Sequence, residues 1–458
     1  MDALFLSRLQ FAMTSMFHYI YPPLSIGVGV ILVIMEGLYV KTKNPLYKKA
    51  AKFWANIFAL IFALGVATGL VQVFGFGTNW SQYSRFVGDV FGSVLASEGI
   101  FAFFLEAGFL GIMLFGWERV SAKIHYLATC LVTFGAHFSA LWIVIANSWM
   151  QTPAGHKIVG EGSAQRAVVE NFWQLIFNPS SVDRVVHVLL GCWLAGMCLV
   201  ISISAYYFLK KKHLPFARVS MKIGLIMTLV TLGLQLLSAD STARGVAQNQ
   251  PSKFAAMEGV YKTEPYTGIN LVGWVDEKEG KVWGIKIPGL LSFLSYHDFE
   301  TPVKGFDQIP ADERPPIQIT FQAYHLMVMM WGVMVLMTLW ALYLWKKGKL
   351  EKATFCLKLL VGMVICPQIA NQVGWVTAEV GRQPWIVYGL LKTKEGVSPF
   401  LTGEQVMFSL IMLFFIYITL LALFLFLLDR KIRQGPEETA NLSDSVVYQD
   451  PYTQKGGV

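Results

Sequence analysis

Residues 355–385 read FCLKLLVGMVICPQIANQVGWVTAEVGRQPW and join an apolar run to the charged stretch that ends it. The run Phe355–Ala378 is long enough to cross a membrane, because a spanning helix needs about 20 mostly apolar residues. The closing stretch 374–385, GWVTAEVGRQPW, places Glu379 at the expected membrane edge and Arg382 three residues later. An ionisable residue at that depth is costly and marks a candidate functional site. The alternative interpretation is an ion pair that caps the end of the helix.

The composition is that of a polytopic membrane protein. Of the 458 residues, 55% are hydrophobic and 14% are charged, whereas a soluble domain carries about 25% charged residues. The net charge of +8 comes from short basic clusters between apolar runs. This pattern disfavours nucleic-acid binding and suits a cytoplasmic membrane face. The five cysteines lie in apolar runs and form neither a C-x-x-C-H haem attachment nor a zinc-binding spacing.

The apolar runs predict an all-α fold with about nine transmembrane helices. The odd-numbered links between them, and the residues after the last, carry most of the basic side chains. The positive-inside rule then places the N-terminus outside and the C-terminus in the cytoplasm. Pro22-Pro23 predicts a kink in the first span. The expected spans are Phe11–Val40, Phe53–Phe76, Val94–Phe115, Tyr126–Met150, Val185–Leu209, Val219–Ala239, Ile319–Trp345, Phe355–Ala378 and Val406–Leu428.

These spans divide the chain into four segments. Residues 1–239 hold the first six helices, 240–318 form a loop outside, 319–430 hold the last three helices and 431–458 form a cytoplasmic tail. The loop mixes aromatic residues with a charged run at 276–279. Such a mixture is typical of an ordered flap or docking surface rather than of a disordered linker.

Six groups able to bind a metal or carry a proton fall in the outer leaflet, on five different helices. Taken singly, a histidine or methionine in a helix is more often a packing residue, but scattered packing residues would not gather in one leaflet. The two acids in one span leave the least room for a packing role, because a carboxylate in hydrocarbon needs a partner. The six are His18, Glu98, Glu106, His187, Met327 and Glu379. His125 and His137, on the fourth span, are expected to be structural.

A histidine and a methionine together hold haem iron six-coordinate and low-spin, whereas a single protein ligand leaves a face open for oxygen. His187 shares a helix face with Gly191, Ala195 and Cys198. Small residues there predict space for a flat macrocycle beside the imidazole. Trp375 shares a face with Glu379, so it lies between redox centres or simply packs. In the second span, Gly65 and Gly69 are four residues apart, a spacing typical of close helix packing.

Seven stretches resemble subunit I of cytochrome bd-type quinol oxidases and together extend over nearly the whole chain. Glu379 followed by GRQPW is the most specific of these matches. The segment between spans six and seven is similar to that of the short Q-loop branch of this family. The stretches are SRLQFAMTSMFHY (7–19), KFWANIFALIFALGVATG (52–69), FGTNWSQYSRFVGDVFG (76–92), SEGIFAFFLEAGFLG (97–111), SALWIVIANSWMQ (139–151), KFAAMEG (253–259) and GWVTAEVGRQPW (374–385).

The resemblance implies a terminal oxidase that takes electrons from membrane quinol at the outer face and reduces O2 to water. It also implies a contribution to the proton motive force without pumping. His187 and Met327 resemble the axial ligands of a low-spin haem b. His18 and Glu379 resemble the ligands of two further haems, a high-spin haem b and a haem d or third b-type haem. Which of the two ligands holds which haem stays open.

The resemblance extends to the surroundings of these haems. Glu98 and Glu106 resemble acids near the haem pair and on the proton route. Arg382 and Trp375 resemble residues near the haem propionates and between haems.

Residues of the outer loop resemble the quinol site of the family. Lys253 and Glu258 match its quinol-contacting residues, so the resemblance makes 240–318 a quinol-binding loop. His325 departs from the pattern, since many members carry arginine two residues before the methionine. The implied partners are a second large membrane subunit, membrane quinol and O2, with small single-helix subunits as an option. The implied location is the bacterial cytoplasmic (inner) membrane.

Two other classes of protein share some of these features. A b-type electron-relay membrane subunit without oxygen chemistry would account for His187 and Met327. An ion-coupled transporter would use Glu98, Glu106 and Glu379 as cation ligands. Transporters often show a pseudo-repeat between halves, whereas none is evident in this sequence and nine spans divide poorly.

Overall fold

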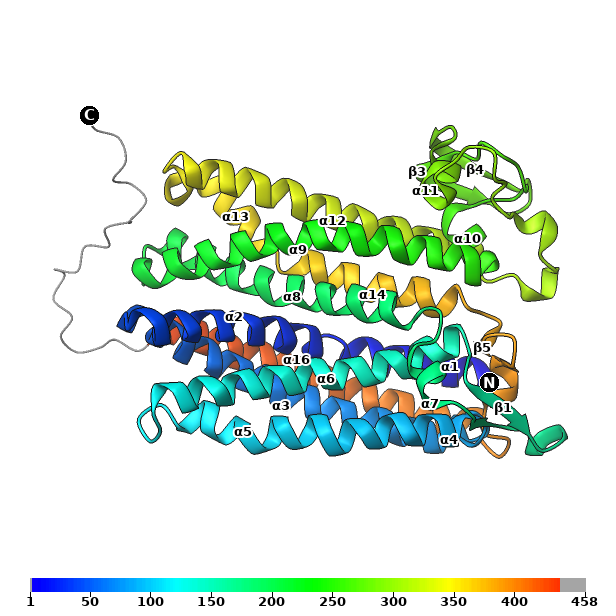
Figure 1. Cartoon of the computed structure of the whole chain (residues 1–458), viewed down its shortest axis with the longest axis horizontal. Coiled ribbons are helices and arrows are strands. Elements are labelled where there is room, and N and C mark those ends of the chain that lie inside the picture. The colour runs from blue at the N-terminus through cyan, green and yellow to red at the C-terminus, as the bar shows by residue number, and fades with distance from the viewer. Residues whose placement is uncertain (1, 437–458) are drawn as a thin grey trace.

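The computed structural model describes residues 2–436, so residues 437–458, most of the expected tail, lie outside the described residues. Nine helical segments of the described part are long and apolar enough to cross a membrane, as predicted. They lie side by side in one bundle (Figure 1). The segments are Ala3–Thr42, Pro45–Thr78, Ser81–Phe115, Ala122–Gln151, Ser181–Lys210, Leu214–Asn249, Ile317–Lys346, Thr354–Val380 and Gly403–Gln434.

The first span consists of two helices, α1 (Ala3–His18) and α2 (Tyr21–Thr42). The kink predicted at Pro22-Pro23 is therefore a helix break just before the prolines. Proline suits the first turn of a helix, because its missing N–H would have no partner there. The break leaves His18 as the last residue of α1.

The third and eighth spans are also interrupted, which the apolar pattern did not predict. The third runs from α4 (Ser81–Ser97) through a π-helical segment (Glu98–Phe103) into α5 (Phe104–Phe115). Single π-helical turns occur frequently at functional sites, and this one begins at a candidate residue. The eighth comprises α13 (Thr354–Gly362) and α14 (Ile365–Val380).

The remaining long helices are continuous. They are α3 (Pro45–Thr78), α6 (Ala122–Gln151), α8 (Ser181–Lys210), α9 (Leu214–Asn249), α12 (Ile317–Lys346) and α16 (Gly403–Gln434). Helix α9 runs ten residues beyond the predicted end at Ala239. The first part of the expected loop 240–318 is therefore helix, because polar residues at a helix end do not by themselves stop the helix.

Short elements gather at the end of the bundle that holds the N-terminus, here called the loop end (Figure 1). Each of its three sheets has two antiparallel strands. The strands are β1 (His156–Val159), β2 (Arg166–Val169), β3 (Ile269–Asp276), β4 (Lys281–Ile287), β5 (Trp385–Val387) and β6 (Leu391–Lys392). The short helices are α7 (Phe172–Ile176), α10 (Pro251–Glu258), α11 (Leu290–Tyr296) and α15 (Thr393–Gly396).

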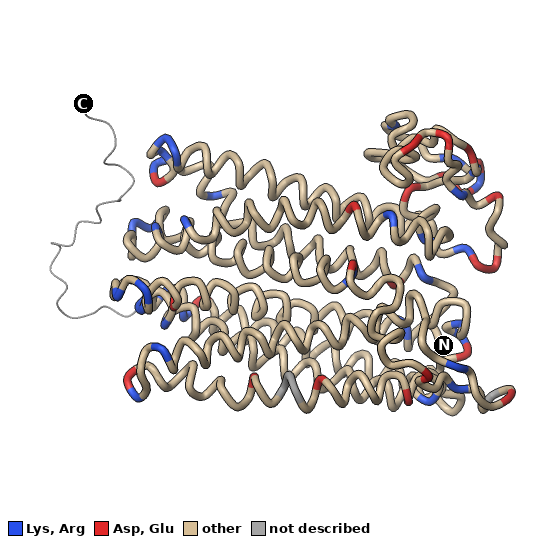
Figure 2. Tube along the Cα trace, viewed as in Figure 1, with Lys and Arg blue, Asp and Glu red and all other residues tan. Residues whose placement is uncertain are grey.

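The opposite end, here called the basic end, carries short links rich in lysine and arginine. Figure 2 shows these blue clusters at the left end of the bundle, away from the N-terminus, whereas the loop end mixes both signs of charge. The clusters include residues 41–52, 210–218, 346–352 and 430–433. This asymmetry is the one from which the sequence predicted the orientation.

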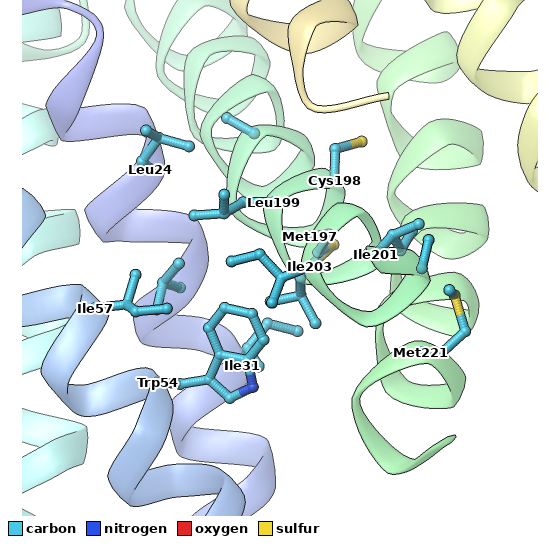
Figure 3. Close-up of a cluster of buried hydrophobic side chains, with 14 of the residues drawn as sticks. Leu24, Ile31, Trp54, Ile57, Met197, Cys198, Leu199, Ile201, Ile203 and Met221 are labelled. Atoms are coloured by element: carbon cyan, nitrogen blue, oxygen red, sulfur yellow. The ribbon is translucent and has the colours of Figure 1, made fainter. Parts of the chain in front are cut away.

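The largest hydrophobic core lies where α2, α3, α8 and α9 meet (Figure 3). Trp54 is fully buried there, and its indole N–H donates to the Ser220 hydroxyl at 3.2 Å. Helices α2 and α8 cross closely at Gly27 and Gly196. A Cβ on Gly196 would lie 2.3 Å from the carbonyl carbon of Gly27. The backbones touch because neither residue has a side chain.

We expect Gly196→Ala to lower the thermal denaturation midpoint of the purified complex. The added methyl group would meet backbone atoms, which cannot rotate away, and such overpacking costs about 1–3 kcal/mol. Gly233→Ala on α9 is the matched control, since a Cβ there would meet nothing within 4 Å. An unchanged midpoint in Gly196→Ala at the same scan rate would contradict the close crossing.

Candidate functional site

Trp375 and Glu379 lie one turn apart on α14 and form the centre of the site. The carboxylate of Glu379 accepts hydrogen bonds from the side-chain amides of Asn147 (3.0 Å) and Gln151 (3.1 Å) on α6. Arg382 also pairs with Glu379. The ion pair considered for the helix end is thus present, but two amides from another helix complete it. A simple helix cap needs neither amide.

Buried and half-buried cations outnumber the carboxylate at this centre. Arg382 is buried, and its Nε and Nη1 atoms have no hydrogen-bond partner among the described residues. The guanidinium of Arg184 lies 5.8 Å from the centroid of the Trp375 ring, and its Nε also lacks a partner in the described part. Burying a charge without a counter-charge is costly. The cluster therefore fits anionic groups such as the carboxylates of haem.

Lys253 adds a third cation to the same centre. Its ammonium donates to Gln151, the residue that also bonds Glu379, and to Gln250 at 2.7 Å. Burial, with the charges of Arg184 and Arg382, holds the pKa of Lys253 well below its usual range.

The fifth span begins earlier than the predicted Val185, so Arg184 belongs to a helix and not to the link before it. It lies within α8 (Ser181–Lys210) and donates to the side chain of Asn147. Hydropathy alone cannot distinguish the first turn of a span from the end of a link, since long basic side chains are tolerated at both. A signal was present, however: Arg184 is three residues before His187 and so shares its helix face.

His187 and Met327 approach the centre from neighbouring helices. The ring of His187 faces Gln235 Nε2 at 3.1 Å, and its Nδ1 lies 3.4 Å from the Ser238 hydroxyl on α9. Met327 on α12 packs on α14, with its sulfur 3.0 Å from the position that a Gly374 Cβ would take. Helices α8 and α12 both pack against α9 and α14. Both side chains are half-buried, as suits ligands of a group held between helices.

The space predicted beside His187 is filled by protein. A Cβ on Gly191 would lie 2.7 Å from the side-chain oxygen of Asn371, so the small residue makes room for that amide. Ala195 and Cys198 are fully buried in the main core. The predicted space for a macrocycle along this face is therefore absent in the described part of the chain, because α8 is a core helix and other helices pack on its small residues. The cations and half-buried aromatic residues lie instead towards the loop end.

His18 lies next to Tyr19, which contacts Trp375 at the centre of the site. Its Nδ1 lies 3.0 Å from the Thr68 hydroxyl of α3, and a Cβ on Gly69 would lie 3.2 Å from its Cε1. Gly69 therefore accommodates an imidazole ring, whereas its spacing had suggested helix packing. Tyr19 stands edge-on to Trp375 with ring centroids 5.4 Å apart. The sequence analysis did not identify Tyr19, although it follows His18 directly.

Glu98, the first of the two acids of the third span, faces α6. Glu98 begins the π-helical segment, and its carboxylate accepts a hydrogen bond from the Ser139 hydroxyl at 2.6 Å. Glu106, eight residues further, is buried within α5. The same α6 carries Asn147 and Gln151, two further residues that the sequence analysis passed over.

Glu258 ends α10 and lies apart from the cation cluster that contains Lys253. It is 1% exposed, and it faces the hydroxyl of Tyr324, which hydrogen-bonds to it. Burial raises the pKa of Glu258 to about 7. His325 connects α12 to the outer loop, since its Nε2 lies 2.6 Å from the carbonyl oxygen of Asn270 in β3. Asn270 in turn donates to the Glu258 carbonyl at 2.8 Å.

Comparisons with known proteins identify the family of this chain. Residues 6–436 match the family described as "Cytochrome bd terminal oxidase subunit I". The "Cytochrome bd ubiquinol oxidase subunit 1" of Bacillus subtilis (strain 168) is 40% identical, covering 99% of this chain and 98% of that protein. The "Cytochrome bd-II ubiquinol oxidase subunit 1" of Escherichia coli (strain K12) is 35% identical, covering 95% and 97%. The bd oxidase structure from Geobacillus thermodenitrificans matches with a TM-score of 0.87 at 29% identity, covering 95% of this chain and 99% of that chain. The chain therefore belongs to the cytochrome bd terminal oxidase subunit I family.

Proposed function

We propose that this chain holds the haems and the quinol site of a quinol:oxygen oxidoreductase. As subunit I of a cytochrome bd terminal oxidase, it works with subunit II in a membrane complex that reduces O2 to water with electrons from quinol. The complex contributes to the proton motive force without pumping. The observation that carries the assignment of the site is the cluster of Arg184, Lys253 and Arg382 around Glu379, in which Lys253 and Arg382 are buried and Arg184 is half-buried.

Four residues would ligate the haems in this proposal. His187 and Met327 hold a low-spin haem b, and His18 and Glu379 hold a high-spin haem b and a haem d or third b-type haem. When bound, the haems supply one-electron transfer and the binding and reduction of O2. The amides of Asn147 and Gln151 orient Glu379, whose carboxylate they bond.

The surrounding cations and aromatic residues position the same groups. The Arg184 and Arg382 guanidinium groups bind haem carboxylates through charge-assisted hydrogen bonds, which are about twice as strong as neutral ones. Trp375 contributes a planar ring to the site and lies against both Tyr19 and Arg184.

The orientation of the chain in the membrane is inferred from the lysine- and arginine-rich links at the basic end. We place that end in the cytoplasm and the loop end outside, in the bacterial cytoplasmic (inner) membrane. Residues 240–318 then contribute the quinol-binding loop, although α9 takes up their first ten residues. Small single-helix subunits complete the complex beside subunit II.

Proton chemistry on the two faces separates charge. Each quinol gives up two electrons and two protons, and four electrons with four protons convert O2 into two waters. Glu258 accepts a quinol proton at the loop end, where the proton is released. Glu98 and Glu106 relay protons from the basic end, and Ser139 holds Glu98 in place.

The spectrum of the purified complex tests this function directly. We expect a pyridine-haemochrome and reduced-minus-oxidised spectrum to show three haems, and we expect O2 uptake with a reduced quinol. A colourless protein would favour an ion-coupled transporter. Haem b without O2 uptake would favour an electron-relay subunit.

Replacing Glu258 tests the base for quinol oxidation. With a pKa of about 7, the wild-type carboxyl is protonated at acidic pH and becomes an ionised base as pH rises. Turnover should therefore increase between about pH 6 and about pH 8, and Glu258→Gln should lose this rise together with on the order of a hundredfold in rate. O2 consumption with a reduced quinol, normalised to haem, measures both effects.

Glu264→Gln is the matched control for this experiment, because Glu264 lies in the same loop but is exposed. Its turnover and pH profile should equal those of the wild type. A Glu258→Gln variant that keeps the wild-type pH profile would exclude Glu258 as the base.

A further inference from the structure

A second pair of ionisable residues lies near the basic end, away from the proposed haem ligands. Glu36 on α2 and His125 on α6 are each 2% exposed. His125 Nδ1 lies 2.5 Å from Glu36 Oε1, and the Thr129 hydroxyl donates to Glu36 Oε2 at 2.6 Å. Such a pair inside a membrane span is expensive to bury and seldom adds stability over a hydrophobic contact. Its presence calls for a role.

A cavity of about 230 Å³ adjoins this pair. This volume has room for several water molecules. His125 lines the cavity, and its Nε2 has no hydrogen-bond partner among the described residues, so water is its natural partner. The lining residues are Glu36, Tyr39, Lys48, Trp117, Glu118, Val120, Ala122 and His125. The cavity thus offers water to a buried imidazole whose other nitrogen contacts a carboxylate.

The cavity reaches the surface beside Glu118 in the short link between α5 and α6. The Glu118 side chain is 72% exposed and binds Lys48 at 2.8 Å and Lys52 at 3.2 Å. These lysines lower the pKa of Glu118, which therefore stays ionised at the mouth. The other titratable groups around the pair are Tyr39 on α2 and Tyr126 and Cys130 on α6.

The register between α5 and α6 shows how far this pair lies from the two acids of the third span along the bundle. Helices α5 and α6 form an antiparallel hairpin, and the Glu98–Ser139 hydrogen bond fixes its register. Glu106, eight residues after Glu98, then lies level with the turn of α6 from Thr129 to Thr133. His125 is one turn closer to the basic end than Thr129, about 6 Å along the helix. Polar groups therefore follow one another from the cavity towards Glu106.

We propose that Glu36, His125 and the adjoining cavity form the inner proton entrance of this chain. The inference rests on the proposed function, in which Glu98 and Glu106 relay protons. A proton from cavity water binds His125 Nε2 while the proton on Nδ1 moves to Glu36. Glu36 passes its proton on through the Thr129 hydroxyl, and exchange with cavity water restores the imidazole tautomer. The pair returns to its starting charge after each transfer.

Glu36→Gln tests the entrance in the purified complete oxidase. We expect wild-type haem content and wild-type anaerobic haem reduction by quinol, because the substitution lies far from both sites. Proton uptake after addition of O2, followed with a pH-sensitive dye, should slow by on the order of tenfold or more. The ratio of variant to wild-type turnover should fall as pH rises, because protons become scarcer, and Glu36→Asp should recover part of the rate.

Two further variants keep the test decisive. Thr129→Val removes one hydroxyl in a nearly isosteric way and should slow proton uptake even if Glu36→Gln assembles poorly. Ser204→Ala is the matched control, since this buried hydroxyl on α8 bonds the Val200 carbonyl of its own helix. It should leave proton uptake unchanged.

The outcomes separate this inference from the function on which it rests. Wild-type proton uptake in both Glu36→Gln and Thr129→Val, at full haem content, overturns the entrance. Loss of haem or of assembly in both variants also overturns it, in favour of a purely structural tie between α2 and α6. Failure of the proposed function would appear instead in the wild-type complex, as missing haem or missing O2 uptake.

Discussion

His187→Ala abolishes the low-spin haem b signal in the reduced-minus-oxidised spectrum and reduces quinol oxidase turnover to background. Imidazole is a common axial ligand of haem iron, and Gln235 and Ser238 hold this one from α9. Met327→Leu should remove the same signal while it keeps the packing on Gly374, because the two side chains have similar volumes. The spectrum and the haem-to-protein ratio measure both effects.

His137→Asn provides the matched control for the loss of an imidazole. His137 Nε2 accepts a hydrogen bond from the Trp193 indole at 2.8 Å, and its Nδ1 faces the Thr133 carbonyl at 2.7 Å. His137 lies outside the proposed ligand set, and its ring contacts the Trp193 indole and a carbonyl of its own helix, so the haem spectrum should survive the substitution. An unchanged spectrum in either His187→Ala or Met327→Leu would reject that pair as ligands.

Glu379→Gln produces the second large effect, loss of one high-spin haem together with lower thermal stability. Arg382 then keeps its buried guanidinium without the paired carboxylate. Removing one partner of a buried ion pair costs about 3–5 kcal/mol. The haem-to-protein ratio reports ligation, and the thermal midpoint at fixed scan rate reports the uncompensated charge.

The double variant Glu379→Gln, Arg382→Gln separates these two roles. Removing both charges should recover much of the thermal stability, because no lone guanidinium remains, but it should not recover the haem. If Glu379→Gln retains all haems and loses stability alone, Glu379 is the helix-end ion pair and not an iron ligand.

The membrane spans could be predicted because a helix that crosses the hydrocarbon layer needs a long run of apolar residues, which is visible in the sequence. Each of the nine apolar runs corresponds to a long helix in the described part of the chain. Hydropathy did not predict the π-helical turn at Glu98 or the break between α13 and α14, because a shifted backbone hydrogen bond does not change which residues are apolar. Hydropathy also placed the end of α9 at Ala239, whereas the helix continues through polar residues to Asn249.

The candidate site was predictable as a set of residues but not as a set of contacts. His125 was expected to be structural because its partner, Glu36, lies 89 residues earlier in the sequence. Pairings across helices depend on register and rotation, which one sequence does not specify. Gly191 was misjudged for the same reason, because the group that fills its space, Asn371, comes from α14.

The close crossing of α2 and α8 sets the depth of two proposed ligands. Both helices run towards the basic end, and they touch at Gly27 and Gly196. His18 precedes Gly27 by nine residues and His187 precedes Gly196 by nine residues, so the two histidines lie at nearly equal heights. An electron moving between their haems would travel in the plane of the membrane. Such a step does no work against the transmembrane voltage, which costs about 2.3 kcal/mol per charge per 100 mV only for movement across it. Respiratory control by voltage should therefore act on proton delivery and leave the rate of haem-to-haem electron transfer unchanged.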